Sequence, residues 1–63
     1  MTIKPAKMVR ILLRAGFVEC AKSGGQRRFV HPDGRMTEVP MHSRELLPYA
    51  QRKILEEARI KLK

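Results

Sequence analysis

The chain has 63 residues, with 14 lysines and arginines against 6 acidic residues and a formal net charge of +8. A chain this short makes one small domain, and its core is too small to enclose a large active site. So basic a composition favours a polyanionic partner: a nucleic acid, an acidic protein or an anionic membrane surface.

The apolar pattern argues against a membrane protein. The longest aliphatic run is Ile11-Leu12-Leu13, and residues 1–5 contain no apolar signal region. The one cysteine, Cys20, suits a reducing compartment, so we expect a cytoplasmic protein. One cysteine and two histidines do not supply the four ligands of a zinc site, and no metal or other cofactor is expected.

A first helix is predicted over residues 4–15. Pro5 suits its first position and Gly16 its end. Between them, apolar side chains recur at helical spacing, at Met8, Ile11, Leu12 and Ala15.

Three short strands are predicted next, over residues 17–21, 27–31 and 36–39. Pro32-Asp33-Gly34 separates the second strand from the third. Asp33 is expected to hydrogen-bond its own backbone in this turn, and His31 to shape the turn. Such short connections predict an antiparallel meander.

A second helix is predicted over residues 47–62, with Pro48 near its start and Tyr49 packed against the sheet. The order helix, three strands, helix implies an α+β fold. Both helices would cover one face of a three-stranded antiparallel sheet and leave the other face open.

The stretch from Lys22 to Arg28 carries the main functional signal. Glycines lack a Cβ atom, so the backbone amides of Gly24 and Gly25 can come close to a ligand, and the cations on both sides favour phosphate. Strand alternation places Gln26 and Arg28 on the open face if Phe29 is in the core, although a bulge at the glycines would reverse this. A polyanion contact is therefore predicted through Lys22, Gly24, Gly25, Arg27 and Arg28.

RNA cleavage at this corner would need groups that move protons. A base must take the proton of the 2′-hydroxyl, donors must stabilise the crowded phosphate, and an acid must protonate the leaving oxygen. Histidine suits the proton steps, and here only His31 and His42 could serve. Gln26 can hydrogen-bond but cannot act as a base near neutral pH.

Segments spread over nearly the whole chain form an ordered set of motifs. They are Ala15-Gly16-Phe17-Val18, Lys22 to Phe29, His31-Pro32-Asp33-Gly34-Arg35, Val39-Pro40-Met41-His42-Ser43, Leu47-Pro48 and Arg52-Lys53-Ile54-Leu55. Their order and spacing resemble those of the HicA toxins of bacterial HicA/HicB toxin–antitoxin pairs.

The resemblance implies one domain over residues 1–63, with an α-β-β-β-α fold like that of double-stranded-RNA-binding domains. It also implies ribosome-independent mRNA cleavage without a metal cofactor, and a larger HicB antitoxin that covers the active site. In that family the second strand opens with a glycine, a small residue and the catalytic histidine. These positions correspond to Gly24, Gly25 and Gln26.

Gln26 therefore stands where the family has its catalytic histidine. Three explanations remain open: an engineered substitution that allows a toxic protein to be produced, a natural loss of cleavage, or chemistry moved to another histidine. For the last, His42 is the better candidate because it lies in a loop before the second helix. The alternative functions are a non-catalytic RNA-binding module and an interaction protein whose basic face docks an acidic antitoxin.

Overall fold

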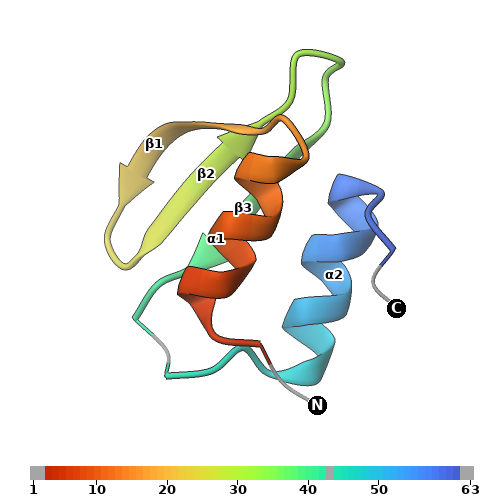
Figure 1. Cartoon of the computed structure of the whole chain (residues 1–63). Coiled ribbons are helices and arrows are strands. Elements are labelled where there is room, and N and C mark those ends of the chain that lie inside the picture. Colours follow the sequence, from red (N-terminus) through yellow and green to blue (C-terminus); the bar gives the residue numbers. More distant parts are fainter. Residues whose placement is uncertain (1–2, 43, 62–63) are drawn as a thin grey trace.

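A computed structural model of the chain describes residues 3–42 and 44–61, except for the side chains of residues 21–23. The elements follow one another as α1 (Pro5–Arg14), β1 (Val18–Ser23), β2 (Gln26–Val30), β3 (Met36–Pro40) and α2 (Pro48–Ala58). The strands form one antiparallel sheet in the order β1-β2-β3, with both helices on the same face (Figure 1). The predicted α+β fold with an open sheet face is confirmed.

The turn between β1 and β2 is tighter than the sequence suggested. β1 continues to Ser23 and β2 begins at Gln26, so only Gly24 and Gly25 lie between the strands. Gly24 has φ 61°, a value that glycine adopts without a steric cost.

The end of α2 corrects the prediction of a helix through residue 62. The helix ends at Ala58 because Arg59 adopts the left-handed conformation, with φ 57°. The amide of Ile60 then donates to the carbonyl of Leu55 at 2.9 Å, which brings the half-buried Ile60 back against the core. Leu62 lies outside the described residues.

The core lies between the sheet and the two helices. Phe29 and Val39 from the sheet and Met8 and Leu12 from α1 are fully buried there. Burial of a side chain the size of Phe29 contributes about 1.5–3 kcal/mol. Such contacts hold the helices on one face of the sheet.

The faces of β2 follow the predicted alternation. Phe29 is buried, whereas Gln26 and Arg28 are exposed. The sheet does contain an irregularity, but it lies in β1 between Glu19 and Ala21 rather than at the glycines. The bulge therefore leaves the alternation along β2 intact, and the predicted assignment of its sides is confirmed.

The turn between β2 and β3 is held by its own polar groups. The amide of Arg35 donates to Asp33 Oδ1 at 3.0 Å, and the Arg35 guanidinium binds Asp33 Oδ2 at 2.8 Å. The amide of Asp33 donates to His31 Nδ1 at 3.2 Å. The predicted turn roles of Asp33 and His31 are confirmed.

This turn is also fastened to the rest of the fold. The Arg35 guanidinium donates to the carbonyl of Ala58 at the end of α2 and lies 5.2 Å from the ring centre of Phe17. The His31 ring meets the same Phe17 ring edge-on, with 5.2 Å between the ring centroids. These contacts attach the C-terminal end of β2 and the turn that follows it to the end of α2.

Candidate nucleic-acid interface

The Gly24–Arg28 corner, which we define as residues 24–28, lies at the free end of the β1–β2 hairpin. Gly24, Gly25 and Gln26 are all exposed. Gln26 is the first residue of β2 and pairs with Ser23 on one side and Pro40 on the other. A ligand can therefore reach both turn glycines and the side chain of Gln26 from solvent.

His42 is brought to this corner by the loop after β3. The amide of Met41 donates to the carbonyl of Gly25, which draws the loop across the turn. The His42 ring then occupies the space where a side chain at position 25 would be. A Cβ atom built on Gly25 would lie 2.6 Å from His42 Nδ1.

The two candidate histidines consequently occupy opposite ends of β2. His42 is exposed beside the residue that precedes Gln26, whereas His31 lies at the other end and is engaged in the β2–β3 turn. Sequence spacing could not place His42 here, because its position depends on how the loop crosses the glycine turn. Of the two histidines, only His42 is placed for chemistry at the corner.

The two arginines of the corner point to opposite faces of the sheet, as strand alternation requires. Arg27 lies 3.7 Å from the Glu19 carboxylate. On the open face, Arg28 donates to Glu38 Oε2 from both Nε and Nη2, at 3.1 Å each. The Arg28–Glu38 pair is exposed and the Arg27–Glu19 pair is partly exposed, and ion pairs at the surface contribute only about 0–1 kcal/mol, so a phosphate can compete for either guanidinium. One phosphate cannot be held by both side chains at once.

Lys22, the remaining predicted contact, is placed only in part. Its backbone belongs to β1 and pairs with Arg27, but its side chain lies outside the described residues. Its role in binding stays a prediction.

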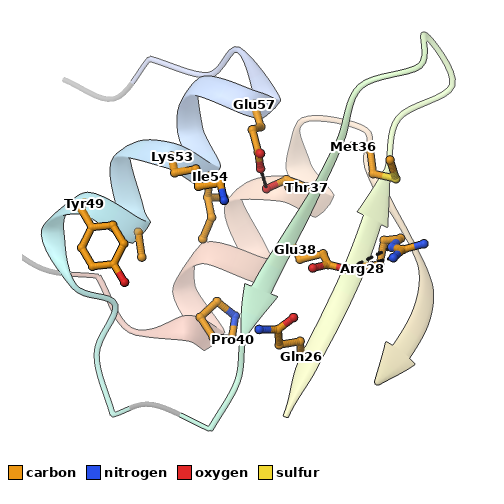
Figure 2. Close-up of a pocket in the computed structure, with 11 residues that line it drawn as sticks. Gln26, Arg28, Met36, Thr37, Glu38, Pro40, Tyr49, Lys53, Ile54 and Glu57 are labelled. Atoms are coloured by element: carbon orange, nitrogen blue, oxygen red, sulfur yellow. Dashed lines mark hydrogen bonds and ion pairs between the residues drawn. The ribbon is translucent and has the colours of Figure 1, made fainter. Parts of the chain in front are cut away.

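A hollow of about 470 Å³ extends from the corner along β3 and α2 (Figure 2). Gln26 and Arg28 line it from β2. The remaining lining residues come from β3 and α2, and they are Met36, Thr37, Glu38, Pro40, Tyr49, Ala50, Lys53, Ile54 and Glu57. The open edge of the sheet is therefore not flat next to the corner.

The prediction that Tyr49 packs against the sheet is wrong. Its side chain is 71% exposed at the rim of the hollow, where Figure 2 shows the ring projecting from the first turn of α2. Sequence reasoning did not predict that Tyr49 and Lys53 line a hollow next to the corner. One signal was present: Tyr49 and Lys53 are four residues apart and share a face of the helix.

We also searched the part of the chain that the structure describes for groups of metal-binding side chains and for membrane-spanning helices. Its histidine, cysteine and acidic side chains form no group of three or more that could hold a metal ion. Neither of the helices within residues 3–42 and 44–61 is long and apolar enough to cross a bilayer.

Comparison with known proteins agrees with the motifs along the chain. A search of curated proteins found no match. The family model described as HicA toxin of bacterial toxin-antitoxin matches residues 5–60. That match covers most of the 63 residues and includes every described helix and strand. The chain therefore belongs to the HicA toxin family of bacterial toxin–antitoxin systems.

Proposed function

We propose that this toxin is an endoribonuclease of the mRNA interferase type that holds an RNA strand at the Gly24–Arg28 corner. The main support for the proposal is that the double-glycine turn is exposed, with arginines beside it and the His42 ring in contact with Gly25. The backbone amides of the two exposed glycines and the neighbouring guanidinium groups suit a phosphodiester. A net charge of +8 favours its capture from solution.

The chemistry proposed is metal-free transesterification. The 2′-oxygen attacks the adjacent phosphorus, its proton passes to a base, and the bond from phosphorus to the 5′-oxygen breaks as that oxygen gains a proton. The products are a 2′,3′-cyclic phosphate and a 5′-hydroxyl. The corner supplies donors for the phosphate, but Gln26 supplies no base. We therefore expect the unchanged chain to cleave RNA weakly or not at all.

Gln26 also favours a second candidate function, a non-catalytic RNA-binding module. The two candidates share a binding surface and differ only in cleavage. Binding in both should weaken with salt, by a log–log slope of about −0.7 for each phosphate neutralised on a single strand. Cleavage of labelled RNA by the unchanged chain, measured beside its binding, separates them.

The proposed partner is a HicB-type antitoxin that covers the corner and forms a hetero-oligomer with the toxin. An antitoxin that masks the RNA-binding surface should present acidic groups to Arg27 and Arg28.

The test is expression of the chain with and without the protein encoded by the adjacent gene. We expect the Gln26→His chain alone to arrest growth and shorten mRNA lifetimes, and co-expression of the partner to restore both. A partner that binds the toxin and leaves RNA binding unchanged would contradict the masking of the corner.

A further inference from the structure

The hollow beside the corner has a composition that phosphate binding does not explain. Tyr49, Lys53 and Glu57 line it at four-residue spacing on α2, as Figure 2 shows. Across from them, Pro40 and Gln26 line the end that adjoins the glycine turn. An RNA strand held at the corner can therefore extend directly into the hollow.

The charges that line the hollow cancel. Its two cations, Arg28 and Lys53, are matched by Glu38 and Glu57, although the whole chain carries +8. Both acids are also engaged: Glu38 pairs with Arg28 at 3.1 Å, and Glu57 accepts a hydrogen bond from the Thr37 hydroxyl at 2.8 Å. A lining with no net charge does not attract a second phosphate. It is better suited to an uncharged group with hydrogen-bonding edges.

The rim of the hollow carries an exposed aromatic ring. Tyr49 is 71% exposed, and within residues 3–42 and 44–61 no other ring contacts it. Such a ring offers a flat face for stacking, and proteins that bind single-stranded RNA combine contacts to the backbone with stacking of bases on aromatic side chains. The amide of Gln26 adds one donor group and one acceptor at the corner end.

We propose that the hollow is a nucleobase subsite. Given the proposed RNA binding at the corner, the base next to the held phosphate enters the hollow and stacks on Tyr49. A neutral lining, an unstacked ring and direct continuity with the corner all favour a base over a second phosphate. This subsite would select single-stranded RNA, since a base must leave its helix to reach Tyr49.

Tyrosine fluorescence tests the proposal directly. Tyr49 is the one tyrosine and the chain has no tryptophan, so the emission reports this ring alone. The chain is titrated with a short single-stranded RNA and with an abasic oligomer that has the same number of phosphates. Binding is followed separately by the anisotropy of an end label. We expect RNA to quench the emission at saturation and the abasic oligomer to bind without quenching.

Variants at position 49 give a second measurement, and an exposed side chain can be changed without disturbing the core. Tyr49→Ala should weaken RNA binding by about tenfold and leave abasic binding unchanged, whereas Tyr49→Phe should keep the wild-type affinity. Leu47→Ala is the matched control, because Leu47 is similarly exposed two residues earlier but does not line the hollow. Free N-acetyltyrosinamide corrects for light absorbed by the bases.

Each contrary outcome overturns the subsite in a recognisable way. RNA binding without quenching, or an equal loss of RNA and abasic binding in Tyr49→Ala, overturns the subsite alone. Quenching by the antitoxin but not by RNA assigns the hollow to a protein partner instead. Absence of any RNA binding overturns the proposed function together with the subsite.

Discussion

The two histidines make an instructive comparison, because they lie at opposite ends of β2 and each ring packs on a glycine. A Cβ atom on Gly16 would lie 3.0 Å from His31 Nε2, and one on Gly25 would lie 2.6 Å from His42 Nδ1. The sequence offers both as candidates for proton transfer. Their surroundings give them different roles.

The His31 end of the strand is closed. His31, Asp33 and Arg35 bond to one another, and Arg35 reaches the carbonyl of Ala58. The Asp33 carboxyl has its pKa lowered, chiefly by the hydrogen bond from the Arg35 amide. The polar groups at this end are occupied in holding the hairpin to α2.

The His42 end is open. His42 is exposed, and no hydrogen bond or ion pair joins its side chain to another of the described residues. The neighbouring Gly24, Gly25 and Gln26 are also exposed. The comparison agrees with the turn role that the sequence predicted for His31, and it shows that the number of internal partners separates a structural histidine from an available one.

Gln26→His should give the largest effect, at the open end. It places an ionisable imidazole at the exposed start of β2, and a positioned acid or base contributes about 10²- to 10⁴-fold to rate. We expect RNA cleavage to rise by this order, measured with end-labelled RNA on denaturing gels. Gln26→Ala is the matched control and should not raise cleavage. If Gln26→His is as inactive as the control, the assignment of position 26 is wrong.

Alanine substitutions at Gly16 and Gly25, the two glycines that a histidine ring contacts, should differ in their effect on the free energy of unfolding. Gly16 has φ 97°, so Gly16→Ala is strained and meets a ring that its own contacts hold in place. We expect a loss of about 1–2 kcal/mol in the free energy of unfolding, measured with urea.

Gly25→Ala should cost less, because its φ is not positive and the clash with His42 can be relieved by a shift of the exposed His42 and its loop, without backbone strain at position 25. Its main effect should be a changed environment of His42 in histidine NMR signals. Equal losses of stability at positions 16 and 25 would mean that the two ends are equally closed.

Arginine replacements make the same contrast on a smaller scale. Arg35→Ala removes the hydrogen bond to Ala58 and the contact with Phe17, and should cost about 1 kcal/mol. Arg28→Ala removes only an exposed pair with Glu38, so its effect on unfolding should be smaller. Urea unfolding checks stability, and anisotropy should show the reverse order for loss of RNA binding. A larger stability loss in Arg28→Ala would contradict the comparison.

The smallest effect is expected from Asp33→Asn. Because folding lowers the pKa of Asp33, its carboxylate stabilises the fold fully at neutral pH, and this contribution is lost as acid protonates it below about pH 4. The variant should therefore be slightly less stable at pH 7 and show a shallower decline in acid. Thermal unfolding at pH 7 and at pH 3 measures both. If the stability of the variant falls as steeply in acid as that of the unchanged chain, the fall is due to other carboxylates.

Much of the fold could be predicted because it depends on local patterns. Pro5 and Gly16 bound α1 within a residue, and the alternation from Arg28 to Phe29 assigned the faces of β2. The end of α2 could not be predicted, since burial of Ile60 overrides helical spacing there. In the candidate site, the corner could be predicted from two adjacent glycines with cations on both sides. The hollow could not, because its walls belong to three separate elements.

The sequence by itself determined the order of the elements, the positions of the turns and a strongly basic surface. These depend on neighbouring residues, on glycine and proline geometry, and on a count of charges. Only the tertiary structure decided that His42 lies on Gly25 and that Tyr49 faces an open hollow. Both placements depend on how residues distant in the chain pack around a loop and a helix, and no local pattern encodes that packing.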